Sequence, residues 1–261
     1  MKILFIGDIF GKAGRQLLID RLSQLKNEFT IDVCIANGEN VAQGRGITEK
    51  TAKVLFAAGV DLFTSGNHLW DKKASLDFIA SDKRILKPIN FPEKSLGNMY
   101  FIYELEDKRK LAVFTVIGQS FMGPADSPFV ACDNMISKIK EETSNIFVDF
   151  HAEATAEKRA LGHYLDGRVG AVVGTHTHIQ TADEEILAQG TAYITDAGMT
   201  GAHDSVIGVR KEIILQKLTT GMPARYEPSD RGLQINAVVI EIDDSTGKAL
   251  NIIRIKRKYD D

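Results

Sequence analysis

The sequence predicts a mixed α/β fold, and three observations support this prediction. Short apolar runs alternate with helix-patterned segments over most of the 261 residues, which is typical of a sheet whose strands pair in parallel. The C-terminal part instead alternates apolar and polar residues, which indicates an antiparallel hairpin with one face in water. Polar side chains that suit metal ions follow several of the apolar runs, and ligands of open α/β sheets bind at such strand ends.

The N-terminal part is predicted to form three strand-and-helix units. Leucines recur at helical spacing after the first apolar run, the turn pair Asn37-Gly38 closes the second run, and Gly59 ends the second helical pattern. Strands are therefore expected at residues 3–6, 31–36 and 60–65, and helices at residues 14–29, 48–58 and 72–80.

The rest of the chain is predicted to add more strands and one helix. Apolar runs predict strands at residues 99–105, 111–117, 146–150, 169–173 and 192–195, and a helix is expected at residues 154–164. Alternating segments at residues 233–242 and 249–255 flank a polar turn at residues 243–247 and predict the terminal hairpin. The sheet is therefore expected to be mixed.

Composition limits the possible function only modestly. We expect one domain over residues 1–261, because no repeat, low-complexity tract or linker interrupts the pattern. The net charge of -3 is spread along the sequence, so no global basic field predicts binding to long nucleic acid. A small anionic substrate would therefore need local positive charge, such as metal ions.

The sequence predicts a protein of the cytoplasm without a membrane segment. It contains only two cysteines, and Cys34 lies within an apolar run, where a buried free thiol is expected. The apolar stretch at the N-terminus stops at Asp8, too soon for a signal peptide, and no run reaches the roughly 20 apolar residues that span a bilayer.

Five apolar runs end in side chains that can bind metal ions. The residues are Asp8, Glu39 with Asn40, Asn67 with His68, His151, and the pair His176 and His178. Any one of the Asp or Asn residues could instead be a turn former or a helix cap. That alternative fails for the whole set, since carboxylates, amide oxygens and imidazoles together match the preferences of borderline divalent metals.

These segments resemble the ordered motifs of the calcineurin-like metallophosphoesterase superfamily. The pattern Gly66-Asn67-His68 before Gly174-Thr175-His176-Thr177-His178 is typical of the superfamily, and Asn37-Gly38-Glu39-Asn40 narrows the resemblance to the YmdB-like bacterial phosphodiesterases. The resemblance covers almost the whole chain. It implies a sandwich of mixed β-sheets flanked by helices, with the ligands at the C-terminal ends of the strands.

The resemblance also implies a ligand set for two divalent metal ions. One ion would bind Asp8, Glu39, Asn40 and His178, and the other Glu39, Asn67, His151 and His176, with Glu39 bridging both. Two residues depart from the commoner superfamily pattern. Phe10 stands where a ligating His often follows the first Asp, and Glu39 replaces the usual bridging Asp, so Asn40 is expected to complete the set. Iron or manganese is expected, with zinc as a further option.

The resemblance further implies a phosphodiesterase that hydrolyses small cyclic nucleotides such as 2′,3′-cyclic AMP. A hydroxide bridging the metals would attack phosphorus, and His68 would act as general acid on the leaving oxygen. The other reading of His68 is a histidine that holds Asn67 in place. Alternatives for the protein are a phosphomonoesterase or RNA-processing nuclease on the same metals, or a regulatory nucleotide-binding scaffold without turnover.

The sequence assigns no role to His163, His203 and Arg45. A surface role is expected for His163 and a solvated loop position for His203, whereas Arg45 could neutralise a substrate phosphate. The basic end at residues 254–258 could contact RNA, although charges on an edge strand more often prevent strand pairing. A homo-oligomer is expected only because symmetric oligomers are common among soluble enzymes.

Overall fold

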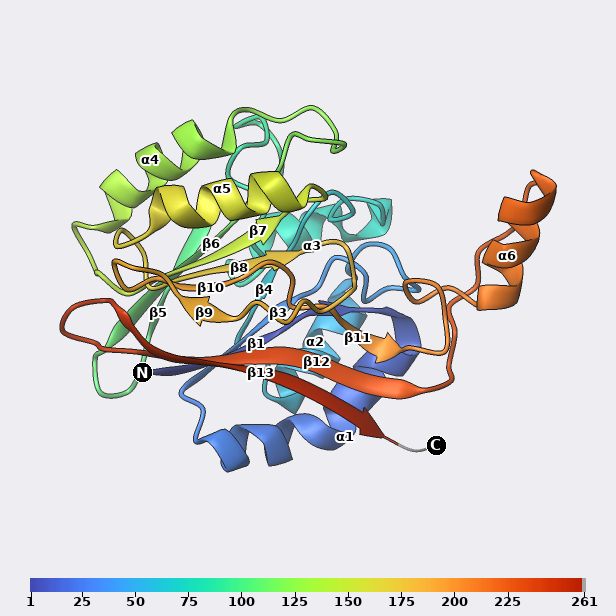
Figure 1. The fold of residues 1–261 in the computed structure, drawn as a ribbon, viewed down its shortest axis with the longest axis horizontal. Helices are drawn as coiled ribbons and strands as arrows, with labels where there is room; N and C mark the ends of the chain where they lie inside the picture. The colour runs from blue at the N-terminus through green and yellow to red at the C-terminus, as the bar shows by residue number, and fades with distance from the viewer. Residues whose placement is uncertain (260–261) are drawn as a thin grey trace.

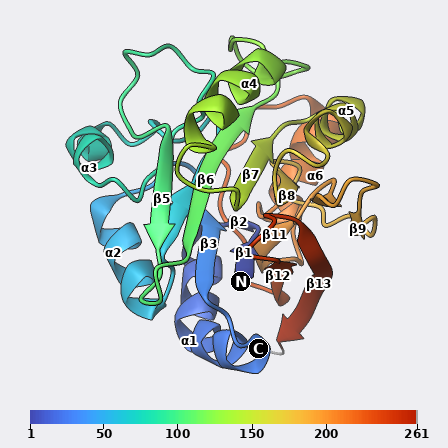
Figure 2. The same cartoon turned by 90° about the vertical axis from the view of Figure 1, so that its left-hand side faces the viewer.

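The computed structural model describes residues 1–259, and two mixed β-sheets pack face to face between helices in it. Helices α1 (Gly11–Phe29) and α2 (Glu49–Ala58) cover the outer face of the first sheet. Helices α4 (Pro128–Ile139) and α5 (Thr155–Leu165) cover the outer face of the second sheet. Figures 1 and 2 show these four layers. The predicted sandwich of mixed sheets flanked by helices is confirmed.

The first sheet combines strands from both ends of the chain. Its order is β2-β11-β12-β1-β3-β4, and β13 pairs with β12 in addition. Strands β1, β3 and β4 are parallel, whereas β12 is antiparallel to β1, β11 and β13. The strands are β1 (Lys2–Ile6), β2 (Asp8–Ile9), β3 (Val33–Asn37), β4 (Leu62–Thr64), β11 (Met199–Ala202), β12 (Leu233–Ile242) and β13 (Ala249–Tyr259).

The second sheet has the order β5-β6-β7-β8-β10-β9. Its four central strands are parallel, and an antiparallel strand lies at each edge. The strands are β5 (Tyr100–Glu104), β6 (Lys110–Ile117), β7 (Ile146–His151), β8 (Ala171–Thr175), β9 (Glu185–Ile186) and β10 (Ala192–Ile194).

Three apolar cores hold the layers together. One lies between the first sheet and helices α1 and α2, the second between the two sheets, and the third between the second sheet and helices α4 and α5. Phe5 and Phe147 meet across the inner core with ring centroids 5.1 Å apart. Because both faces of each sheet are covered, the parallel strands are nearly continuous apolar runs, as the sequence predicted.

Several element boundaries differ from the prediction. Helix α1 begins at Gly11 instead of residue 14, because Phe10 precedes it without a side-chain cap that could mark the start. The helix expected at residues 72–80 is a 3₁₀ turn (Lys73–Ser75) followed by α3 (Leu76–Ser81). The strand expected at residues 60–65 shortens to β4, and β13 continues four residues beyond the expected end at residue 255.

The prediction also missed two helices and three short strands. Helix α4 and helix α6 (Lys211–Thr220) were not expected, nor were β2, β9 and β11. Helix α6 buries none of its residues and extends from the body of the molecule (Figure 1), and three of its apolar residues are consecutive, at positions 213–215, so its amphipathic pattern is weak. Strands of two to four residues are too short for a periodic signal.

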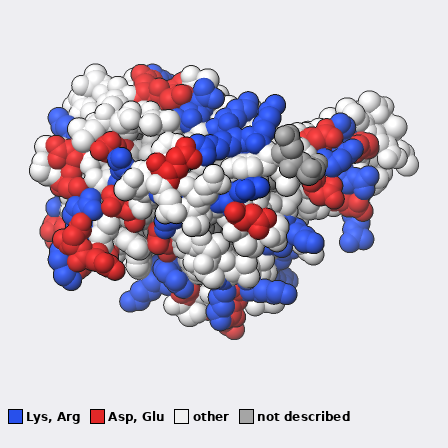
Figure 3. Space-filling view, turned by 90° about the horizontal axis from the view of Figure 1, so that it is seen from below, with Lys and Arg blue, Asp and Glu red and all other residues white. Residues whose placement is uncertain are grey.

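The surface carries both signs of charge. Figure 3 shows acidic and basic side chains interspersed on one face of the molecule. On β13, Arg254 pairs with Glu184 and Arg257 with Glu28, while Lys256 and Lys258 are exposed. No helix within residues 1–259 is long and apolar enough to cross a membrane.

Candidate metal centre

The ends of five parallel strands bring all eight predicted site residues into one region. Asp8 follows β1, Glu39 and Asn40 follow β3, Asn67 and His68 follow β4, His151 ends β7, and His176 and His178 follow β8. Because the first three strands belong to one sheet and the last two to the other, the site lies where the carboxyl ends of both sheets meet. The two sheets thus supply different parts of one site.

The first cluster of ligand atoms surrounds the side-chain amide of Asn40. Its Nδ2 lies 3.1 Å from His178 Nε2, 3.2 Å from Glu39 Oε1 and 3.5 Å from Asp8 Oδ1. His178 Nε2 also lies 3.8 Å from Asp8 Oδ1. A rotation that exchanges amide oxygen and nitrogen changes the shape little, and it would turn the Asn40 oxygen toward the same three neighbours.

The second cluster surrounds His151 Nε2. This atom lies 3.1 Å from Asn67 Oδ1, 3.0 Å from His176 Nδ1 and 3.2 Å from Glu39 Oε1. Ligand atoms of Glu39, His151 and His176 all lie within 4.8 Å of one another. Because Glu39 Oε1 belongs to both clusters, this carboxylate lies between them. Its other oxygen, Oε2, accepts a hydrogen bond of 3.0 Å from the backbone N–H of His68.

Each of the three imidazoles is held by its outward nitrogen. Nδ1 of His151 contacts Thr175 Oγ1 at 2.9 Å, and this hydroxyl donates to Asp149 Oδ1 at 2.6 Å. His178 Nδ1 donates to the carbonyl oxygen of Ile207 at 3.0 Å. The inward nitrogens of both rings therefore carry no proton in the neutral form and face the clusters with a lone pair.

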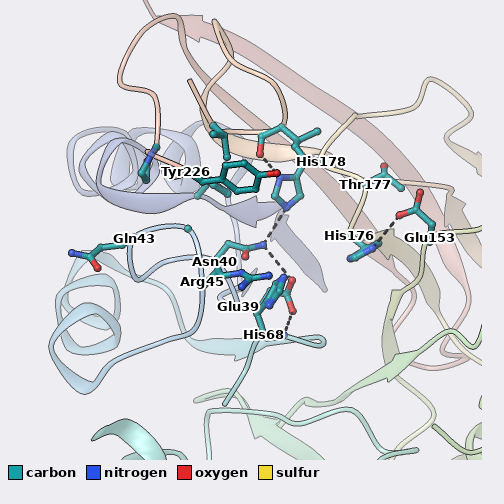
Figure 4. A pocket seen from close by; sticks show the side chains of 15 residues that line it. Glu39, Asn40, Gln43, Arg45, His68, Glu153, His176, Thr177, His178 and Tyr226 are labelled. Carbon is teal, nitrogen blue, oxygen red and sulfur yellow. Dashed lines mark hydrogen bonds and ion pairs between the residues drawn. The ribbon is translucent and has the colours of Figure 1, made fainter. Parts of the chain in front are cut away.

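His176 is oriented the other way round. Its Nε2 lies 3.1 Å from a carboxylate oxygen of Glu153 (Figure 4). Its Nδ1 therefore points to the second cluster. Carboxylate, hydroxyl or carbonyl partners on the outward nitrogen are typical of histidines that bind metals.

The geometry of both clusters fits divalent metal ions. Ligands held about 2.1 Å from one ion lie about 3.0–3.4 Å apart, and the separations within the two clusters are 3.0–3.8 Å. His151 Nε2 faces an amide oxygen, a carboxylate oxygen and a second imidazole nitrogen, so a proton or a cation must stand between these atoms. Carboxylates, amides and imidazoles are suitable donors for borderline divalent metals.

Burial and charge shift the pKa values of these groups strongly. Burial alone would lower the pKa of His151, but the Glu39 carboxylate raises it to about 9. Burial and the neighbouring His151 lower the pKa of His176 to about 3. Burial also raises the pKa of Asp8. In the metal-free protein a proton on His151 thus takes the position between the acceptors, while His176 stays neutral.

The loop that carries His176 and His178 has an uncommon backbone. Both residues have positive φ, 97° and 66°, which side chains other than glycine rarely adopt. Thr177 between them donates to Asp196 Oδ2 from its hydroxyl at 2.7 Å and from its backbone N–H at 3.2 Å. Lys158 Nζ donates to the same oxygen at 2.6 Å. A buried ion pair therefore holds the strained loop.

His68 lies at the edge of the clusters and is oriented by Asp71. Its Nδ1 lies 2.9 Å from Asp71 Oδ2, and Arg45 Nε lies 3.7 Å from that oxygen. His68 lines the pocket in front of the clusters, so its Nε2 is available to a bound molecule. The backbone N–H of His68 also donates to Glu39 Oε2, which links His68 to the carboxylate between the two clusters.

A pocket of about 450 Å³ opens in front of both clusters (Figure 4). One part of its wall is polar and includes Glu39, Asn40, His68, His176 and His178, and the rest is apolar. Arg45 also lines this pocket, whereas His163 lies exposed on α5, as predicted. His203 is not the solvated loop residue that was expected: it is partly buried, and its Nε2 donates to the carbonyl oxygen of Met199 at 2.9 Å.

The sequence did not reveal the residues that support the predicted ligands. Asp71 and Glu153 follow His68 and His151 by three and two residues, so their positions close to predicted site residues were the available signal. Asp149 lies within an apolar strand that gave no signal for it, and Thr175 was noted only as part of the motif before His176. Gly66 passes so close to the His151 ring that a Cβ would overlap it, which explains the glycine before Asn67.

Comparisons with known proteins found similar chains. The profile of a family described as "YmdB-like protein" matches residues 4–255. A Bacillus subtilis protein named 2′,3′-cyclic-nucleotide 2′-phosphodiesterase is 46% identical over 255 residues, which is 98% of this chain and 96% of that protein.

Two solved structures are also similar. A hypothetical protein from Thermus thermophilus has a TM-score of 0.92 and 37% identity, with 99% of both chains covered. A structure described as a novel phosphatase from Mycoplasma pneumoniae has a TM-score of 0.94 and 35% identity, with 100% of this chain and 94% of that chain covered.

Proposed function

The chain belongs to the YmdB-like family, and we propose on this basis that it is a metal-dependent phosphodiesterase that hydrolyses 2′,3′-cyclic nucleotides. The name of the Bacillus subtilis relative supports the substrate class, because that protein shares nearly half of its residues with this chain over almost its full length. Cleavage by a 2′-phosphodiesterase breaks the bond between phosphorus and O2′ and leaves a 3′-phosphate.

The main support is the convergence of three imidazoles on Glu39 and the adjacent Asn40. His151, His176 and His178 each have one nitrogen held by an outward partner, and the other nitrogen turns toward Glu39 or its neighbour Asn40. A core that needed only stability would not bury so many acceptor atoms facing one another, since polar atoms are costly to hold in low dielectric.

Two ions can be assigned to the two clusters. Asp8, Glu39, Asn40 and His178 would hold one ion, and Glu39, Asn67, His151 and His176 the other. When bound, two divalent ions supply a nucleophile from water at neutral pH and offset the charge that develops on phosphorus. We propose iron or manganese, with zinc as a further candidate, because nitrogen and oxygen donors are mixed at both positions.

His68 is proposed to protonate the departing O2′. Asp71 engages its Nδ1, so the proton on Nε2 can be offered to a substrate in the pocket. Arg45 lines the pocket beside this pair and can contact a phosphate oxygen.

We further propose a homo-oligomer in the cytoplasm. Support for assembly comes from α6, which extends from the body and buries none of its residues within this chain. Support for the location comes from the two free, buried cysteines, since disulfides are rare in the cytoplasm. Light scattering of the purified protein tests the assembly, and fractionation of cells tests the location.

The function can be tested with metal-stripped protein and phosphorus NMR. Addition of manganese or ferrous iron is expected to start ring opening of 2′,3′-cyclic AMP to the 3′-monophosphate. The double variant Asn67→Ala, His176→Ala should remain inactive, whereas the matched control His163→Ala, on the exposed face of α5, should behave as wild type. Faster metal-dependent turnover of an aryl phosphate or of RNA would favour the monoesterase or the nuclease. Metal binding without any turnover would favour the scaffold.

A further inference from the structure

The pocket has an apolar part to which none of the predicted metal ligands contributes. Phe10, Ile207, Val209, Tyr226 and Pro228 form this part, which we call the apolar wall. Ile207 is 51% exposed and Tyr226 50% exposed, so a large apolar surface faces water directly beside the clusters. We infer that the apolar wall binds the nucleobase of the substrate, with Tyr226 stacked on the base. This inference rests on the proposed function.

Backbone hydrogen bonds hold the segments of the apolar wall together. Val209 and Pro228 form an antiparallel bridge, and the N–H of Ser229 donates to the carbonyl oxygen of Gly208 at 2.8 Å. The N–H of Arg210 also donates to the carbonyl oxygen of Glu227 at 2.9 Å. The two segments that flank α6 are therefore tied together at the pocket, and a ligand would meet a preformed surface.

Ile207 connects the apolar wall with the first cluster. Its φ is 47°, a conformation that a β-branched residue adopts only under strain. In this conformation its carbonyl oxygen accepts the hydrogen bond from His178 Nδ1, while its side chain lines the pocket. One strained residue thus sets the distance between the metal-binding imidazole and the apolar wall. Strain at such a position is typical of sites where geometry matters for function.

Phe10 forms the floor of the apolar wall. Its ring is nearly buried and meets the His178 ring edge-on, with centroids 5.6 Å apart. Glycines at positions 44 and 208 leave room for it, because a Cβ at either would come within 2.7 Å of the ring. A phenylalanine at this position removes one potential ligand and extends apolar surface up to the cluster.

Tyr226 offers a flat aromatic face in the same pocket. Its hydroxyl accepts a hydrogen bond from Lys217, and Lys217 Nζ lies 4.7 Å from the ring centroid. The ring is thus held from the α6 side, and Figure 4 shows it in the pocket together with His178 and Asn40. A cyclic nucleotide needs a flat apolar surface for its base next to a polar surface for its phosphate. The pocket has both, and its volume lies within the usual range for small ligands, about 300–1,000 Å³.

Steady-state kinetics of the metal-loaded enzyme test this site with two substrates. 2′,3′-cyclic AMP has a base, and 1,2-cyclic glycerophosphate has the same five-membered phosphodiester ring without one. Tyr226→Ala and Tyr226→Leu are expected to raise KM for 2′,3′-cyclic AMP by about 5- to 150-fold, the range expected for one lost base–aromatic stack. Turnover of the base-free substrate should change much less, and Tyr226→Phe should recover most of the affinity for the nucleotide.

Tyr164→Ala serves as the matched control, because Tyr164 is 42% exposed on α5 and does not line the pocket. Calorimetric titration with adenosine 3′-monophosphate gives a second readout that is independent of turnover, and Tyr226→Ala should weaken this binding by a similar factor. Equal KM and equal binding in Tyr226→Ala and wild type would overturn the inference while the proposed function stands. Failure of the wild-type enzyme to open either ring would instead overturn the proposed function.

Discussion

Lys158 provides a sharp test of how the fold holds the site. It lies on α5 with 1% exposure, and its Nζ donates to Asp196 Oδ2 at 2.6 Å and to the carbonyl oxygen of Thr175 at 2.7 Å. Thr175 directly precedes His176, and Asp196 also accepts both hydrogen bonds from Thr177. The change Lys158→Met keeps the length of the side chain and removes the charge. The carboxylate of Asp196 is then left buried without a cation.

The expected loss of stability is large. Removing one partner of a buried ion pair costs about 3–5 kcal/mol, because the remaining charge is neither solvated nor paired. The loop with His176 and His178 also loses the contact that offsets its strained backbone. Since groups that orient metal ligands typically contribute about 10–100-fold to metal affinity, we expect manganese to bind Lys158→Met more weakly by that factor.

Urea denaturation of the metal-free protein measures the first effect, and calorimetric titration with manganese measures the second. Lys87→Met is the matched control. Lys87 is equally buried, but its Nζ donates only to the carbonyl oxygens of Pro92, Glu93 and Ser95, away from the site. The control should lose stability and keep its metal affinity. The reasoning is refuted if Lys158→Met binds manganese as tightly as the control, or if its free energy of unfolding equals that of wild type.

Three further predictions concern protonation, thiol reactivity and acid catalysis. Burial would lower the pKa of His151 but Glu39 raises it to about 9, so the metal-free ring is charged at neutral pH. Metal binding should then release about one proton, and metal affinity should rise as pH rises toward that pKa. Calorimetry in buffers of different ionisation enthalpy would count the released protons. A count of zero would contradict the charged state of His151. Burial raises the pKa of Cys34 and raises that of Cys132 to about 12, so neither thiol should react with a disulfide reagent until urea unfolds the protein. His68→Ala should slow ring opening of 2′,3′-cyclic AMP by about 10²–10⁴-fold. It should slow hydrolysis of a p-nitrophenyl diester far less, because that leaving group needs no proton. Equal losses on both substrates would assign His68 a structural role.

Much of the fold could be predicted because its buried strands are continuous apolar runs. The hairpin of β12 and β13 was recognised from its alternation, and Gly59 correctly marked the end of α2. The prediction missed elements whose burial produces no periodic pattern of apolar residues in the sequence. Helix α6 has no buried face, and the short strands β2 and β11 form by pairing between distant parts of the chain, β2 with β11 and β11 also with β12.

The sequence by itself determined which chemical groups follow the strands, and in which order. Because parallel strands of a sheet end at a common edge, this order was enough to predict that Asp8, Glu39 and Asn67 lie near one another. It was also enough to recognise the family, whose profile matches residues 4–255.

Only the tertiary structure decided how these groups are oriented. His178 turns its Nε2 toward the site because the carbonyl oxygen of Ile207 accepts from its Nδ1, and His176 turns its Nδ1 there because Glu153 contacts its Nε2. Neither Ile207 nor Glu153 is part of a recognised motif. The apolar wall likewise arises where the segments on either side of α6 meet Phe10. A side chain's tautomer, and the surface it faces, depend on partners that are distant along the chain. The order of residues alone does not specify those contacts.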